Sequence, residues 1–136
     1  MMDKAGQLTL VERAESLIEV VLIATEKSPK KYRFTFSARM QNMAFDILEH
    51  VYFANEVFVQ SKQSYELRRS HQNKVLTNAK LLVYMAKVAE RCGAILPKQF
   101  GEIAQLTVDI KNMTGGWIKS DEKRYYQLQQ RRGTSV

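Results

Sequence analysis

The sequence predicts an all-α fold, an antiparallel up-down-up-down bundle of four helices. Apolar residues recur at intervals of three and four along most of the chain, which is the period of an amphipathic helix. The pattern is interrupted at Ser28-Pro29, at 60–64, at 93–97 and after Ser120. With two prolines and six glycines, the chain has too few turn residues for a many-stranded sandwich. Four segments of about twenty residues joined by short links are typical of a helical bundle.

The first helix is expected over residues 9–27. Thr9 is a candidate N-cap, because Glu12 follows it at the capping-box spacing. At about 100° per residue, one side of the helix is apolar. The residues expected there are Leu10, Ala14, Leu17, Ile18, Val21, Leu22 and Thr25. The far side carries an acidic stripe, Glu12, Glu15, Glu19 and Glu26. Val20 and Ile23 lie off the core side, which indicates a second buried surface.

The second helix is expected over residues 37–60. Its core side is expected to hold Met40, Met43, Ala44, Ile47, Leu48, Val51, Ala54 and Phe58. Phe45, Tyr52 and Phe53 lie outside this side. Leaving large aromatic side chains in water forgoes about 1.5–3 kcal/mol each. These three residues therefore indicate either a wide core stripe or, with Val20 and Ile23, an oligomer interface.

The third helix is expected from Ser64 or Tyr65 to Cys92. Its buried side is expected to hold Leu67, Val75, Ala79, Leu82, Val83, Ala86 and Ala89. Basic residues gather on the opposite side within about 40° and form a row that we call the basic ridge. The members of the basic ridge are Lys62, Arg69, Lys80, Lys87 and Arg91, with Lys62 included only if the helix begins that early.

The fourth helix is expected from Pro97, in the favoured first-turn position, to about Lys119. Its apolar row is Ile103, Leu106, Ile110, Met113 and Trp117. Gly115 and Gly116 each cost about 1 kcal/mol relative to Ala inside a helix, so a close helix crossing, a kink or a frayed end is expected there. Residues 121–136 have no apolar stripe and are expected to be a mobile basic tail after a bundle of residues 1–120.

The composition describes an ordinary globular chain, with 45% hydrophobic and 26% charged residues. The single cysteine cannot form an internal disulfide, which favours a reducing compartment. The longest apolar stretch, residues 20–24, is far shorter than the roughly twenty residues that cross a bilayer. The N-terminal residues also lack the apolar core of a signal peptide. We therefore expect a cytoplasmic protein with no membrane partner.

The net charge of +7 is unevenly distributed along the chain. Residues 1–60 hold seven basic and eight acidic residues, whereas residues 61–136 hold fourteen basic and six acidic residues. A basic balance favours nucleic acid, anionic lipid or acidic proteins as partners. The second half of the chain is therefore the part expected to contact such a partner.

Residues that could support catalysis are few. Cys92 lies at the end of the third predicted helix, and the two histidines, His50 and His71, lie on different helices, so no nucleophile has an evident base beside it. Asp46, Glu49 and His50 are close on one helix, but a di-metal site in a bundle needs a second such set. The chain also lacks a Gly-rich phosphate loop. We expect no enzymatic activity, no catalytic residue, no metal and no cofactor.

Three basic groups remain as candidate contacts for nucleic acid or for an acidic partner. The first is the link with Lys30, Lys31, Arg33 and the following Arg39, and the second is the basic ridge, of which Arg69, Lys80, Lys87 and Arg91 are the candidates. The third is the tail with Lys123, Arg124, Arg131 and Arg132. Cations interleaved with Tyr and Phe suit phosphate contact and base stacking. Two alternatives stay open: a solvated surface, or pairing of the basic ridge with the acidic stripe of another subunit.

Several short motifs resemble a known family. They are Leu10-Val11-Glu12-Arg13, Pro29-Lys30-Lys31-Tyr32-Arg33-Phe34, Ser37-Ala38-Arg39-Met40 and Gly115-Gly116-Trp117-Ile118. Their order resembles the four-helix-bundle family of the accessory variability determinant (Avd) proteins of diversity-generating retroelements. A sister branch is encoded in intervening sequences of ribosomal RNA genes. The resemblance covers about residues 8–120, and the long basic third helix and basic tail favour the first branch.

This resemblance implies a homopentameric barrel that binds a reverse transcriptase and RNA or DNA, supports synthesis of mutagenised complementary DNA, and has no active site. The tail beyond residue 120 lies outside the resemblance. The alternatives are a bundle protein of a ribosomal RNA intervening sequence, and a purely structural oligomer that does not bind nucleic acid.

Overall fold

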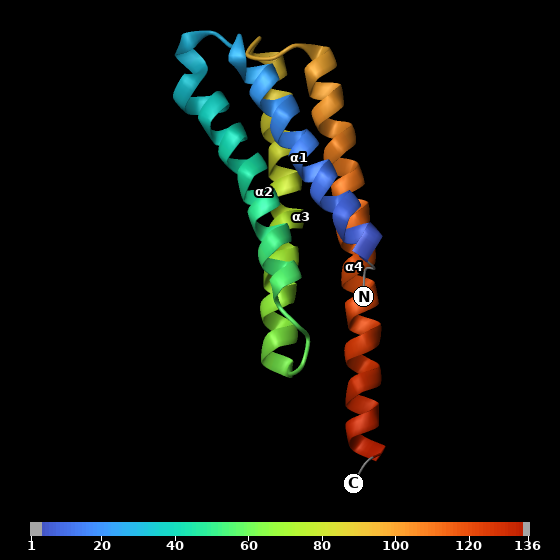
Figure 1. The fold of residues 1–136 in the computed structure, drawn as a ribbon. Coiled ribbons are helices and arrows are strands. Elements are labelled where there is room, and N and C mark those ends of the chain that lie inside the picture. Colours follow the sequence, from blue (N-terminus) through green and yellow to red (C-terminus); the bar gives the residue numbers. More distant parts are fainter. Residues whose placement is uncertain (1–3, 135–136) are drawn as a thin grey trace.

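The structure is a computed structural model that describes residues 4–134. Within that range the chain is all-helical and has no strand (Figure 1). The α-helices are α1 (Lys4–Glu26), α2 (Ala38–Glu56), α3 (Lys62–Arg91) and α4 (Pro97–Thr134). A 3-10 turn, η1 (Lys30–Tyr32), and a π-helical turn, η2 (Arg33–Ser37), lead into α2. The predicted fold class, a helical protein built from four main helices, is confirmed.

Each α-helix packs against two others: α1 and α3 each contact both α2 and α4. Figure 1 shows the links before α2 and before α4 at one end of the molecule, and the link between α2 and α3 at the other. Hydrogen bonds join the link before α2 to the link before α4. Ser28 Oγ donates to the Ala94 carbonyl at 2.5 Å, and Tyr32 Oη donates to the Cys92 carbonyl at 3.1 Å. Residues far apart in sequence are thereby fixed at one end of the bundle.

The core follows the predicted apolar rows. Its larger buried side chains include Leu10, Leu17, Met40, Ile47, Leu82, Ile103, Ile110 and Trp117, and alanines fill the spaces between them. Three predicted core residues are exposed. Leu22 lies one position past the inward row of α1, Leu67 lies one position before the inward row of α3, and Phe58 follows the end of α2. The inward rows step by four and three residues, so a neighbour of a row member points about 100° away from it.

Two helices begin earlier than predicted. The start of the first helix at Thr9 is wrong, because α1 already begins at Lys4 and Thr9 Oγ1 donates back to the Ala5 carbonyl at 2.9 Å. The start of the third helix at Ser64 or Tyr65 is also wrong. Ser61 caps α3, since its Oγ accepts from the Ser64 amide at 3.1 Å and Ser64 Oγ accepts from the Ser61 amide at 2.9 Å.

The fourth helix ends later than predicted. The expected end at about Lys119 is wrong, because α4 continues as a helix to Thr134. Tyr125, in this extension, stacks on Tyr65 of α3 with ring centroids 4.2 Å apart and planes at 6°. The division at residue 120 and the mobility of the tail stay predictions, and residues 135–136 lie outside the described range.

The glycine pair of α4 therefore lies inside the helix and not at a frayed end. A Cβ atom placed on Gly115 or Gly116 would meet no atom within 4 Å. Among residues 4–134, no other helix comes close enough to these glycines to compensate for them, contrary to one of the alternatives expected from the sequence.

Candidate nucleic-acid interface

The central part of the basic ridge is exposed on α3. Lys80, Lys87 and Arg91 lie on one side of the helix, at spacings of seven and four residues, and all three are exposed. Tyr84, 69% exposed, lies in the same row between the two lysines. Within the described part of the chain, these three cations form no ion pair. The row covers about 16 Å of a rigid helix, so the cations are held at fixed spacings.

Arg69 differs from the rest of the basic ridge. Its Nη1 lies 2.6 Å from Glu122 Oε1 of α4, and its Nε donates to Asn73 Oδ1 at 3.4 Å. The Arg69 side chain is half-buried, and its charge is balanced within the chain. The structure therefore brings together Lys80, Lys87 and Arg91, and separates Arg69 from them by an ion pair to another helix.

The link before α2 carries the first basic group. Lys30 and Lys31 in η1 and Arg33 in η2 are exposed, as is Arg39 in the first turns of α2. Lys31 Nζ lies 5.0 Å from the centre of the Tyr32 ring. Because Tyr32 donates to the Cys92 carbonyl, this link lies at the same end of the molecule as Arg91. The first basic group and the end of the basic ridge therefore lie at one end of the bundle.

The third basic group lies at the opposite end. Lys123, Arg124, Arg131 and Arg132 are exposed on the last turns of α4. Arg132 Nη2 donates to the carbonyl of Gln60, in the link between α2 and α3, at 2.7 Å. Since the 30 residues of α3 span about 45 Å, the tail group and the link group form two separate basic surfaces.

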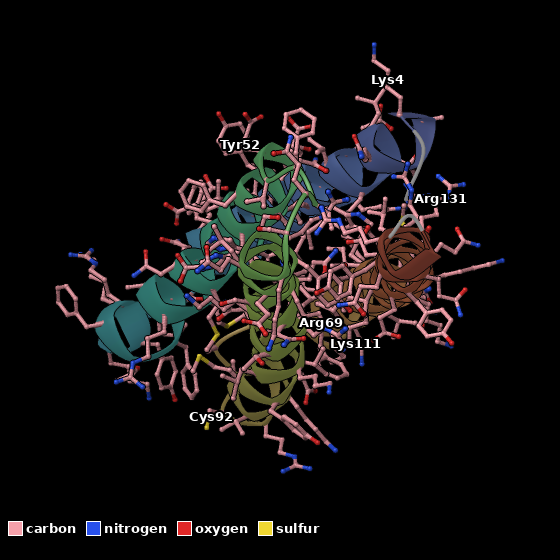
Figure 2. The ribbon with its side chains drawn as sticks, turned by 90° about the horizontal axis from the view of Figure 1, so that it is seen from below. Lys4, Tyr52, Arg69, Cys92, Lys111 and Arg131 are labelled. Atoms are coloured by element: carbon pink, nitrogen blue, oxygen red, sulfur yellow. The ribbon has the colours of Figure 1, made fainter. Side chains whose placement is uncertain are left out.

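The predicted oligomer-interface residues lie on the outer sides of α1 and α2. Ile23 is 63% and Tyr52 is 56% exposed, Phe45 and Phe53 are also exposed, and Val20 is half-buried. Figure 2 shows Tyr52 on the side of α2 that faces away from α4. Val11, Phe45, Leu48 and Tyr52 line an apolar groove of about 490 Å³ between α1 and α2. Ile23, Phe45, Tyr52 and Phe53 are thus available for a contact outside the chain, whereas Val20 packs against the core.

Sequence reasoning missed a buried polar cluster between α3 and α4. The Arg68 side chain is 2% exposed, and its Nε lies 2.9 Å from Asp121 Oδ2. Arg68 Nη1 donates to the Val57 carbonyl at 3.0 Å, and Gln72 Nε2 donates to Asp121 Oδ2 at 2.8 Å. The Arg68 guanidinium also lies over the Trp117 ring, 5.0 Å from its centre. Burial lowers the pKa of Arg68 and the Asp121 carboxylate opposes this, so the guanidinium stays charged at neutral pH.

A signal for this cluster exists in the sequence. The inward row of α3 is Arg68, Gln72, Val75, Ala79, Leu82, Ala86 and Ala89, which steps by four and three residues without a break. Extending the apolar part of the row backwards leads to Gln72 and Arg68. Polar residues at core positions of a helix indicate a buried polar network.

The histidines also meet, which sequence reasoning did not anticipate. His50 Nδ1 of α2 and His71 Nδ1 of α3 are 3.0 Å apart, and the rings stack with centroids at 5.2 Å. Burial lowers the pKa of His71, and the neighbouring His50 and Lys74 add to this effect. Residues 4–134 contain no group of three or more His, Cys, Asp or Glu side chains arranged to hold a metal ion.

Comparisons of the chain with protein-family models, with curated proteins and with solved structures found no match. None of the helices in residues 4–134 is both long and apolar enough to cross a bilayer. The resemblance to the Avd family therefore stays a prediction drawn from the short motifs.

Proposed function

We propose that this chain is a non-enzymatic accessory protein of a diversity-generating retroelement, which binds RNA or DNA through the basic ridge and binds the reverse transcriptase of that element. The observation that carries the nucleic-acid part is the exposed row of Lys80, Tyr84, Lys87 and Arg91 on α3. The reverse transcriptase, the support of mutagenic cDNA synthesis and a cytoplasmic location are taken from the resemblance and the composition.

The chemistry of the row suits a single-stranded nucleic acid. Lysine and arginine side chains bind phosphates and release condensed counterions, which favours binding at low salt. An exposed aromatic ring between them offers a surface on which a base can stack without sequence preference. Tyr84 has this position, and the adjacent link with Lys30, Lys31 and Arg33 extends the cationic surface at the same end.

The proposal includes an antiparallel up-down-up-down order of the helices and assembly into a pentameric barrel. Large apolar side chains left exposed on a single chain are typical of a subunit contact. The contact residues we propose are Val20, Ile23, Phe45, Tyr52 and Phe53. Five copies of a +7 chain carry about +35, and multivalent display strengthens phosphate binding.

A second candidate, a purely structural oligomer, is favoured by one observation. Glu12, Glu15, Glu19 and Glu26 are all exposed on α1 and form an acidic stripe of one sign. This stripe can pair with the basic ridge of another subunit, in which case the ridge serves assembly rather than nucleic-acid binding. The other branch of the family, the bundle proteins of ribosomal RNA intervening sequences, is expected to have the same fold, so this alternative stays open.

Charge reversal on the basic ridge tests the proposal. Lys80→Glu, Lys87→Glu and Arg91→Glu together are expected to abolish binding of a single-stranded RNA in fluorescence anisotropy, while light scattering shows an unchanged oligomer. The matched control reverses Lys4, Lys98 and Lys119, which are exposed on α1 and α4, and changes the net charge equally. The control is expected to retain most of the RNA affinity.

Two results would contradict the proposal. Dissociation of the ridge variant into monomers supports the structural oligomer. Equal loss of RNA binding in the ridge variant and the control means that only total charge matters. The retroelement part is tested separately, since a reverse-transcriptase gene is expected beside the gene for this chain.

A further inference from the structure

A polar pocket of about 510 Å³ lies where α1 ends and α2 begins (Figure 1). Its walls come from the last residues of α1, from the link through η1 and η2, and from the first turn of α2. This volume is within the range of about 300–1,000 Å³ that small-molecule sites have. One small ligand, or one unit of a polymer, can therefore enter the pocket.

The lining of this pocket is cationic, and its cations are not balanced inside the chain. Lys27, Lys30 and Arg33 are exposed in the lining, and Glu26 adds one carboxylate. Among residues 4–134, none of these three cationic side chains forms an ion pair or a hydrogen bond. Three cations and one carboxylate give the lining a net charge of +2, which favours an anionic group such as a phosphate.

Two polar side chains in the lining have hydrogen-bonding capacity that a ligand can reach. Ser37 is 7% exposed, and among the described residues its hydroxyl group has no hydrogen-bond partner. This hydroxyl group is not sealed in the core, because Ser37 borders the pocket. Gln41 Nε2 donates to Thr25 Oγ1 at 2.9 Å, which leaves Gln41 Oε1 open as an acceptor. Hydroxyl and amide groups of this kind form hydrogen bonds with the edge of an unpaired base.

Phe34 supplies an aromatic wall of the pocket. Its side chain is 81% exposed in η2, next to the cationic Arg33. An exposed ring beside cations offers a face on which a base can stack. A free phosphate or a carboxylate would use the cations alone, whereas a nucleotide combines a phosphate with the edge and the face of a base. A nucleotide therefore matches more of this lining than a simple anion does.

We propose that this pocket binds one unpaired nucleotide of an RNA or DNA strand. The phosphate contacts Lys30 and Arg33, and the base stacks on Phe34. The edge of the base forms hydrogen bonds with Ser37 and Gln41. The site rests on the proposed function, since it requires that the chain binds nucleic acid, and it deepens that function by adding a place where a single base is held.

Removing the base from the RNA and the ring from the protein tests the site as a double-mutant cycle. Hexauridine and an abasic hexamer with the same number of phosphates are titrated by fluorescence anisotropy. We expect Phe34→Ala to weaken binding of hexauridine by roughly fivefold or more and to leave binding of the abasic strand unchanged. The matched control is Phe58→Ala, because Phe58 is 71% exposed in the link between α2 and α3, at the other end of the molecule. This control is expected to bind both strands like the unmodified chain.

Photo-crosslinking locates the base directly. A single-stranded RNA that carries iodouridine is expected to crosslink to the tryptic peptide of residues 34–39, as identified by mass spectrometry of the full chain. The crosslink is expected to disappear from that peptide in Phe34→Ala and to persist in Phe58→Ala. A crosslink pattern that lacks this peptide in the unmodified chain overturns the proposal.

Three further results overturn the proposal. In the first, Phe34→Ala binds hexauridine like the unmodified chain. In the second, it weakens the abasic strand as much as hexauridine, so the ring holds no base. In the third, it changes the oligomeric state in light scattering, so the ring belongs to a subunit contact. Failure of the proposed function has a different signature, because the unmodified chain then binds neither strand and both proposals fall together.

Discussion

Arg68 of α3 and Asp121 of α4 meet with Nε 2.9 Å from Oδ2, and both side chains are almost fully buried. Gln72, one turn along α3, donates to the same carboxylate oxygen at 2.8 Å. The contact lies one turn beyond Trp117, the last member of the predicted apolar row of α4. A polar network therefore continues the packing of α4 against α3 where the apolar row ends.

Removing the carboxylate of this pair is expected to be costly. Asp121→Ala leaves the Arg68 guanidinium buried without its partner, and breaking a buried pair in this way costs about 3–5 kcal/mol. We expect a loss of that size in the free energy of unfolding, measured by urea denaturation followed by circular dichroism.

The neighbouring residue provides a matched control. Glu122 pairs with Arg69 at 2.6 Å, but both side chains are substantially exposed. An exposed pair contributes about 0–1 kcal/mol, so Glu122→Ala is expected to change the free energy of unfolding by no more than that. Similar losses in the two variants would show that burial of the Arg68–Asp121 pair is not the deciding factor.

Gly116 is expected to be replaceable at a gain. It lies inside α4, and a Cβ atom there would meet nothing within 4 Å. Ala is favoured over Gly inside a helix by about 1 kcal/mol, so Gly116→Ala is expected to raise the melting temperature of the chain. The comparison is Gly93→Ala, which is expected to lower it, because Gly93 has φ +79° and side chains strain the backbone there. A destabilised Gly116→Ala variant would indicate that another chain packs against this position.

His71 is expected to make the fold sensitive to acid. Burial, followed by His50 of α2 and Lys74 of α3, lowers the pKa of His71 below its ordinary 6.5. The unfolded chain then takes up a proton at a higher pH than the folded chain. Stability is therefore lost as the pH falls from about 6.5 through the lower pKa of the folded state. Urea midpoints measured on either side of this range are expected to differ less in His71→Gln than in the unmodified chain. An equal difference in both would assign the pH dependence to other groups.

The core could be predicted because burial follows a simple geometric rule. Apolar side chains spaced by three and four residues lie on one side of a helix, and Leu17, Ile47, Leu82 and Ile110 are buried as that rule requires. Applied to apolar residues alone, the rule misses Arg68, although the same spacing continued backwards from Val75 reaches it. Its burial depends on Asp121, which is distant in sequence, and no local pattern reveals such a partner.

The helix ends were harder to predict for a related reason. Thr9 and Glu12 have the spacing of a capping box, yet α1 begins at Lys4, and Thr9 Oγ1 donates to the Ala5 carbonyl inside the helix. At the other end of the chain, α4 extends past its apolar row and its extension contacts α3 through Asp121 and Tyr125. Contacts with α3, rather than an apolar row, thus accompany the continuation of α4 beyond Lys119.

The candidate interface could be predicted only in part. The helical period correctly places Lys80, Lys87 and Arg91 on an exposed side of α3. The same period places Arg69 with them, but cannot show that Glu122 of another helix neutralises it. Whether a surface cation is available for a ligand depends on its neighbours in space. The helical period of one segment gives no information about residues on other helices.

Tyr84 and Lys87 are expected to contribute to RNA binding in different ways. Base stacking is worth about 1–3 kcal/mol per base and depends little on salt, so Tyr84→Ala is expected to lower RNA affinity at every salt concentration alike. Tyr84→Phe keeps the ring and is expected to bind almost normally. Lys87→Gln removes one phosphate contact, which is expected to reduce the slope of log affinity against log salt by about 0.7 for a single strand. Fluorescence anisotropy over a series of salt concentrations measures both quantities. If Lys87→Gln leaves the slope unchanged while the RNA still binds, the phosphates contact another surface, and the basic group on the link before α2 is the next to test.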